Sequence, residues 1–176
     1  MALTQVDIDM LSTTGTLPAL DGSALTGTGS VLQTVYHSYT DSTSTTLSQS
    51  YVNVTNGYKT ITSIGNNSKF LVTATANIYQ SAGTGCNLGI SRTISGTTTR
   101  LLGVDGASGD AWMGFGNGIS SSSGTLYREY LDSPSQSAGT AITYQTLFSR
   151  WTAGTIYVNY SGYDATSMII IQEIAA

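Results

Sequence analysis

Any acid–base or nucleophilic chemistry in this chain has to rely on very few side chains. His37 is the single histidine, so a Ser-His-Asp relay would have to use its imidazole as the base. It lies in a strand-like stretch, residues 35–39, that also contains two tyrosines. We interpret His37 as a structural histidine. The alternative is a ring of three His37 side chains around a trimer axis, which would hold a metal or an anion.

The ten carboxylates do not indicate a hydrolase. A glycosidase needs two carboxylates on either side of a sugar, and no spacing here selects such a pair. Asp105 and Asp110 share a short loop but lack the ligand spacing of an EF-hand, so we interpret them as solvated turn residues. The glycine-rich residues 114–118 have no basic neighbour and no following helix, unlike a phosphate loop. We therefore predict no enzymatic activity, no metal and no cofactor.

The best candidate for recognition is a group of large apolar side chains in a glycine-rich region. Trp112, Met113 and Phe115 lie within residues 103–124, which contain seven glycines and are predicted to form loops. Exposed aromatic rings in loops often contribute binding energy, including by stacking on sugars. Large apolar groups are more often buried, so we favour a role in plugging the fold or in a trimer contact.

Composition excludes several classes of partner. Only 9% of the residues are charged, the net charge is −4, and the six basic residues are dispersed along the chain. This distribution argues against binding to nucleic acid or to a membrane surface. The first residues have neither the basic nor the apolar region of a secretory signal. Cys86, the single cysteine, is interpreted as a small buried hydrophobic residue.

Abundant Thr, Val, Ile and Tyr, punctuated by Gly and Ser, predict strands joined by turns. We expect a hairpin of residues 48–54 and 58–64 that turns at Asn56-Gly57, and a second hairpin that turns at Ser95-Gly96. No segment has a helical period, so the fold class is all-β, an antiparallel jelly roll or β-sandwich. The other strands are expected at residues 31–40, 69–79, 87–94, 98–102, 125–131, 142–150, 155–160 and 168–174.

Residues 1–30 differ from the rest and are expected to form an extended N-terminal anchor and neck. Val6, Ile8 and Met10 alternate with polar residues, as in a strand added to another protein. The following stretch contains breaks at Pro and Gly together with Leu17, Leu20 and Leu25. The segment is too short to bury these leucines by itself, which indicates that another chain covers them.

Several short motifs, in one order along nearly the whole chain, resemble the head-fibre, spike and tail-fibre proteins of tailed bacteriophages, particularly marine and cyanobacterial ones. The matching stretches are residues 17–26 in the neck, 31–35 at the first strand, and 67–72, 130–134, 143–145 and 169–176 in the C-terminal jelly-roll domain. The resemblance implies a trimeric structural protein of the virion, with no enzymatic activity. The chain is short for a tail fibre, which favours a compact appendage.

Together these observations predict two regions, an anchor at residues 1–30 and a jelly-roll head at residues 31–176. We expect a homotrimer bound to a capsid or other virion protein, assembled in the host cytoplasm. It would serve as a capsid spike, a decoration protein or a short head fibre. The alternative is the distal domain of a phage tail fibre, which would bind a carbohydrate receptor on the host surface.

Overall fold

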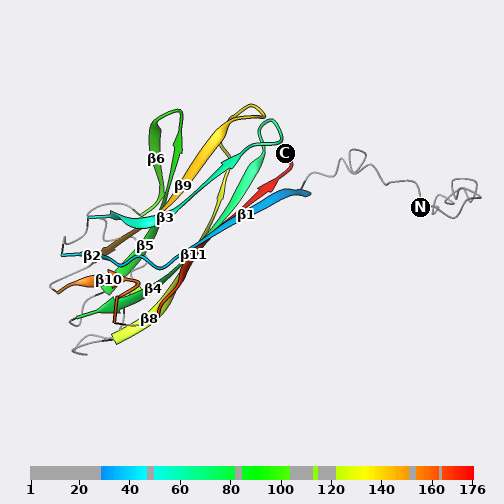
Figure 1. Ribbon diagram of the computed structural model, residues 1–176. Helices are drawn as coiled ribbons and strands as arrows, with labels where there is room; N and C mark the ends of the chain where they lie inside the picture. Colours follow the sequence, from blue (N-terminus) through cyan, green and yellow to red (C-terminus); the bar gives the residue numbers. More distant parts are fainter. Residues whose placement is uncertain are drawn as a thin grey trace, which may run out of the picture.

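The computed structural model describes residues 29–46, 50–81, 85–103, 113–114, 122–150, 154–162 and 164–176. Regular structure in these ranges consists of strands in two antiparallel sheets that pack face to face (Figure 1). The predicted all-β sandwich is therefore confirmed. The strands are β1 (Val31–Tyr39), β2 (Thr43–Thr45), β3 (Val52–Thr62), β4 (Lys69–Gln80), β5 (Gly85–Ile94), β6 (Thr97–Leu102), β7 (Met113–Gly114), β8 (Ser122–Asp132), β9 (Ala141–Arg150), β10 (Ile156–Val158) and β11 (Ser167–Ile174).

The pairing order is that of one long hairpin rolled into two sheets. Strand β1 pairs with β11, β3 with β9, β4 with β8 and β5 with β6, so each pair encloses the next along the chain. When this long hairpin folds over on itself, β4 also pairs with β11 and β5 also pairs with β9. Sheet A then contains β1, β11, β4 and β8, extended by β10 and β2, and sheet B contains β3, β9, β5 and β6, with β7 beside β5. This arrangement agrees with the predicted jelly roll.

Alternation of apolar and polar residues explains why the long strands form a core. In β4 every second residue, from Phe70 through Val72 to Ile78, is buried between the sheets. Strand β9 contributes Tyr144 from the other sheet, and the Phe70 and Tyr144 ring centroids lie 6.1 Å apart. Such alternation places one full face of each strand in the core. Cys86 belongs to this core, as predicted, and burial raises the pKa of its thiol to about 12.

The predicted hairpin at Asn56-Gly57 is wrong. Strand β3 runs through both residues, and its two halves pair with the same partner, β9. The register shifts between Asn53 and Tyr58, and Asn56 has a φ of 55°. An Asn at positive φ suits a β-bulge as well as a turn. The sequence motif identified the unusual backbone but not its role, because the partner strand decides whether the chain reverses.

The predicted turn at Ser95-Gly96 is confirmed, since both residues have positive φ and Ile94 pairs with Thr97 across it. Two short strands were not predicted, β2 and β7, and β8 begins at Ser122, within the region expected to be loop. These short segments have too few residues to display a periodic pattern.

Glu173 links β11 to the turn between β3 and β4. Its buried carboxylate accepts hydrogen bonds from the backbone N–H of Ile64 and Gly65, both at 2.9 Å, and from Gln33 Nε2 at 2.6 Å. Burial raises the pKa of Glu173, but these hydrogen bonds favour the ionised form more strongly, so its pKa lies below the usual value. The ionised Glu173 carboxylate therefore stabilises the turn between β3 and β4.

Replacing Glu173 with Gln is expected to lower the free energy of unfolding at pH 7 by about 2–4 kcal/mol, since the amide donors would face backbone donors. A carboxyl group whose pKa is lower in the folded state than in the unfolded state stabilises the folded protein at pH values above its unfolded pKa. This stabilisation is lost as the pH falls through the folded pKa, because the carboxylate is then protonated. The difference in free energy of unfolding between the wild type and Glu173→Gln should therefore become smaller as the pH falls below about 5. Urea unfolding across this pH range measures it. A constant difference at all pH values would contradict the assigned role.

Candidate functional site

The sole histidine lies at the open edge of the sandwich, between β1 and β3. The His37 ring stacks on Tyr39 with centroids 6.2 Å apart, and both line a groove of about 500 Å³ together with Asp41 and Lys59. Asp41 Oδ2 accepts a hydrogen bond from Asn56 Nδ2 at 2.9 Å. Among the described residues, no hydrogen bond joins His37 to a carboxylate or a hydroxyl. His37 is half-buried and stacked on Tyr39, and its structural role stays a prediction.

The buried carboxylates of the described residues stabilise the fold instead of forming an acid–base pair. Asp132 accepts two hydrogen bonds from Arg92, at 2.7 and 2.9 Å, and a third from the Tyr144 hydroxyl at 2.8 Å. Burial, and then the nearby Asp132 charge, raise the pKa of Tyr144. Glu173 is held by the β3–β4 turn as described above. In the described ranges, no three His, Cys, Asp or Glu side chains gather as a metal site.

The outward face of sheet A has several large apolar side chains among its polar residues. Cross-strand register places Tyr36, Ile170, Thr73 and Glu129 in one row, because paired residues share a face. Tyr36 is 66% exposed and Ile170 half-buried. Adjacent rows add further apolar residues, and Tyr127 and Leu131 are 51% and 50% exposed. We call this set the apolar face; it comprises Tyr36, Leu71, Tyr127, Leu131, Met168 and Ile170.

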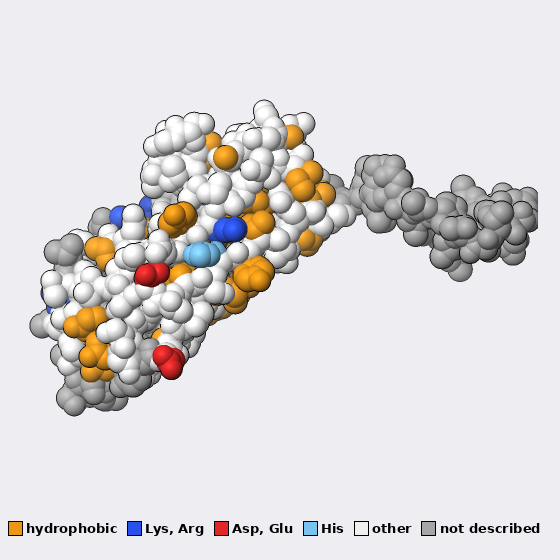
Figure 2. All heavy atoms as spheres, in the orientation of Figure 1, with side chains coloured by type: hydrophobic (Ala, Val, Ile, Leu, Met, Phe, Trp, Pro, Cys, Tyr) orange, Lys and Arg blue, Asp and Glu red, His pale blue; other side chains and the backbone are white. Residues whose placement is uncertain are grey.

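The outward face of sheet B has the opposite character. A row of threonines crosses it through β3, β9, β5 and β6, from Thr60 and Thr143 to Thr93 and Thr98. The Thr60 and Thr143 hydroxyls are 2.7 Å apart, and those of Thr93 and Thr98 are 2.8 Å apart. Charged side chains are sparse in the view of Figure 2, and only 9% of the residues in the sequence are charged. Hydroxyl groups suit contact with water, whereas the apolar face of sheet A is suited to another surface.

The described chain begins beside its own C-terminus. The N–H of Gly29 donates to the Ala175 carbonyl at 3.3 Å, and the N–H of Ala175 donates to the Ser30 carbonyl at 2.9 Å. The exposed side chains of Val31, Leu32 and Ile64 lie near this point, since β1 starts here and Leu32 approaches the turn after β3. The described chain therefore starts at the end of sheet A where β1 begins and β11 ends (Figure 1).

Most site residues predicted from the sequence lie outside the described residues. These are Val6, Ile8, Met10, Leu17, Leu20 and Leu25 in the anchor, and Trp112 and Phe115 in the glycine-rich region. For Met113 only the backbone is described, and it pairs with Cys86. The apolar face was missed. Its signal was present in residues 168–171, an apolar run read only as a buried strand, because a strand with apolar residues on both faces is covered on both sides.

No family model matches the chain, and no curated protein matches it. Similar solved structures include that of the Gx strain of infectious bursal disease virus, with 15% identity and a TM-score of 0.36 over 84% of this chain and 39% of that one. The crystal structure of the VP2 subviral particle of infectious bursal disease virus has 16% identity and a TM-score of 0.37, over 84% of this chain and 38% of that one. Eiger TNF from S. frugiperda has 9% identity and a TM-score of 0.35, over 71% of this chain and 90% of that one.

The chain thus spans about two fifths of the length of the viral proteins it matches. TM-scores this low support no conclusion about function or assembly. Within the described ranges, no helix has the length and apolar character needed to cross a membrane.

Proposed function

We propose that this chain is a non-catalytic structural protein of a tailed-phage virion. It acts as a homotrimeric capsid spike, decoration protein or short head fibre, and residues 1–30 attach it to a capsid or other virion protein. The observation that carries the proposal is the apolar face of sheet A, where three large side chains are at least half exposed to water in the single chain. The resemblance of the sequence to phage fibre proteins supplies the virion setting.

A second copy of this chain is the partner that suits the apolar face. Charged side chains on this face are few, and Glu129 already accepts a hydrogen bond from Tyr127 at 2.5 Å. The chain enters the sandwich at the end of the same face, where Gly29 pairs with Ala175. Copies that associate through this face would bring their N-terminal segments together, so that neighbouring chains cover Leu17, Leu20 and Leu25. Three linked anchors bind far more tightly than one, through effective concentration.

Deleting residues 1–28 is expected to abolish incorporation into virions while leaving the head trimeric. The cut preserves Gly29 and Ser30, whose backbone bonds to Ala175 close the end of the β1–β11 pair. The measurement is quantitative mass spectrometry of purified particles that carry the full-length or shortened chain, with electron microscopy to locate the full-length protein.

The triple variant Leu17→Ser, Leu20→Ser and Leu25→Ser tests the neck separately from the first ten residues. Reduced incorporation of this variant is expected, since its neck leucines no longer pack against neighbours. Full incorporation of the shortened chain, or absence of the full-length chain from purified virions, would contradict the proposal.

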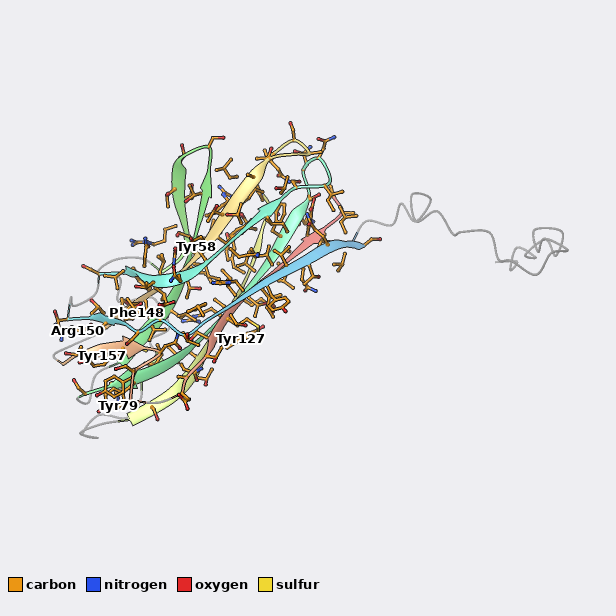
Figure 3. The ribbon with its side chains drawn as sticks, viewed as in Figure 1. Tyr58, Tyr79, Tyr127, Phe148, Arg150 and Tyr157 are labelled. Atoms are coloured by element: carbon orange, nitrogen blue, oxygen red, sulfur yellow. The ribbon has the colours of Figure 1, made fainter. Side chains whose placement is uncertain are left out.

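A distal receptor-binding domain of a tail fibre is the second candidate. It is favoured by a hollow lined by Tyr79 and Tyr160 at the end of the sandwich away from residue 29 (Figure 3).

A further inference from the structure

Three tyrosines from two strands and a loop form one aromatic cluster. Tyr79 lies on β4, Tyr157 opposite it on β10, and Tyr160 two residues after β10. The Tyr79 and Tyr160 rings stack with centroids 4.5 Å apart, and Tyr157 meets Tyr160 edge-on at 4.9 Å. All three side chains are half-buried. Figure 3 shows Tyr79 and Tyr157 together at the end of the sandwich opposite the C-terminus. Each tyrosine combines an apolar ring with a polar hydroxyl.

The backbone beside Tyr160 is shaped to let its ring lie close. A Cβ atom at Gly162 would be 2.7 Å from Cε1 of Tyr160, closer than side chains approach each other. Only glycine therefore leaves room for the ring in this position. The close approach helps to set the orientation of Tyr160 on Tyr79.

Two hollows adjoin the cluster and share Ala165. The first, of about 230 Å³, is lined by Tyr79 and Tyr160 on one side and by Ser123 and Thr125 of β8 on the other. The second, of about 400 Å³, is lined by Thr40, Ser161, Asp164 and Thr166 among others. The first presents aromatic rings and hydroxyls, and the second presents hydroxyls and the exposed Asp164 carboxylate. Among the described lining residues neither hollow has a Lys or Arg.

We propose that these two hollows form a binding site for a neutral oligosaccharide. A pyranose ring has an apolar C–H face and a rim of hydroxyls, which match an aromatic ring beside hydroxyl and carboxylate groups. One sugar packs against the parts of the Tyr160 and Tyr79 rings that line the first hollow. The next sugar occupies the second hollow, where Asp164 accepts hydrogen bonds from its hydroxyls. The absence of basic groups among the described lining residues disfavours anionic sugars.

The site borders the apolar face proposed to join the copies but shares none of its six residues. The boundary is a polar row at the edge of the first hollow, in which Asn77 of β4 pairs with Thr125 of β8. The Thr125 hydroxyl donates to Asn77 Oδ1 at 2.8 Å, and Asn77 Nδ2 donates to the Thr166 carbonyl at 2.5 Å. Because the cluster lies at the end away from residue 29, an anchored protein would present it outward. The inference does not depend on the virion role, and sugar binding by a monomer would leave it intact.

Saturation-transfer NMR on the full-length chain tests the proposal with four probes: the methyl glycosides of D-glucose, D-galactose, D-mannose and N-acetyl-D-glucosamine. Saturation is expected to reach the ring C–H protons of at least one probe. Tyr160→Leu keeps the apolar bulk but removes the flat ring, and should weaken that binding about tenfold. Gly162→Ala, which displaces the ring, should weaken it as well. Tyr58→Ala, on sheet B, is the matched control and should bind as wild type does.

Tyr160→Phe keeps the stacking face and should retain most of the binding. If Tyr160→Leu fails to fold, Asp164→Asn on the exposed loop takes its place and should weaken binding of a matching disaccharide more than of the monosaccharide. The proposal is overturned if no probe receives saturation from the wild type. It is equally overturned if Tyr160→Leu folds and binds as the wild type does.

Discussion

Ile170→Asp is expected to leave the chain monomeric, in contrast to the trimer proposed for the wild type. The residue lies at the centre of the apolar face, in the row that also contains Tyr36 and Glu129. A carboxylate there would have to be buried without a partner in each copy, and it would lie on the same face as an existing negative charge. An uncompensated charge at an interface costs several kcal/mol, so association should weaken by at least about 100-fold.

Sedimentation velocity at micromolar concentration measures this effect. The matched control is Thr98→Asp, which adds the same charge to the exposed threonine row of sheet B and should leave the trimer intact. Circular dichroism should show unchanged β structure in both variants. A trimeric Ile170→Asp variant would exclude the apolar face as the contact surface, and a monomeric wild type would exclude the trimer itself.

The second large effect is expected for Asp132→Ala, which should lower the free energy of unfolding by about 3–5 kcal/mol. The Asp132 carboxylate is buried and accepts bonds from Arg92 and Tyr144, so its removal leaves a guanidinium and a phenol without their acceptor. A buried charge that loses its partner destabilises far more than the pair stabilised. Equilibrium urea unfolding followed by tryptophan fluorescence provides the measurement.

The double variant Arg92→Met with Asp132→Leu separates the loss of the pair from the loss of one partner. It should be more stable than Asp132→Ala, because the unpaired charge is gone and apolar groups take its place. Tyr144→Phe should cost only about 1 kcal/mol, the usual net value of one hydrogen bond. If Asp132→Ala lowers the free energy of unfolding by less than about 1 kcal/mol, then water solvates Arg92 in the variant. The hydrogen bonds among Arg92, Asp132 and Tyr144 would then not be important for stability.

Local sequence patterns predicted the secondary structure well where one strand face is buried. Strand β4 alternates without interruption from Phe70 to Ile78, and the predicted boundaries differ from the observed ones by one residue. The Ser95-Gly96 turn needed only two residues with positive φ between two strands. The Asn56-Gly57 motif has the same local preference, yet it forms a bulge. Its outcome depends on β9, more than eighty residues away, which pairs with both halves of β3.

The candidate sites were less accessible to sequence reasoning. Tyr79, Tyr157 and Tyr160 form one cluster only because β10 pairs with β4 across a long sequence separation. The apolar face likewise joins β1, near the start of the described chain, to β11 at its end. No motif of adjacent residues marks either surface, so a search for catalytic or loop motifs selected His37 and Trp112 instead.

The amino-acid sequence by itself determined that this protein is built from strands, because β-branched and aromatic residues alternate with polar ones and no helical period competes. It also determined which side of β4 is apolar enough to be buried. Only the tertiary structure decided which apolar side chains stay outside. The two faces of a strand such as β11 are both apolar, and packing of sheet A against sheet B buries Ile169 and Ile171 while leaving Met168 and Ile170 on the outer face. The reason is that burial depends on contacts between residues distant in sequence, which no local pattern encodes.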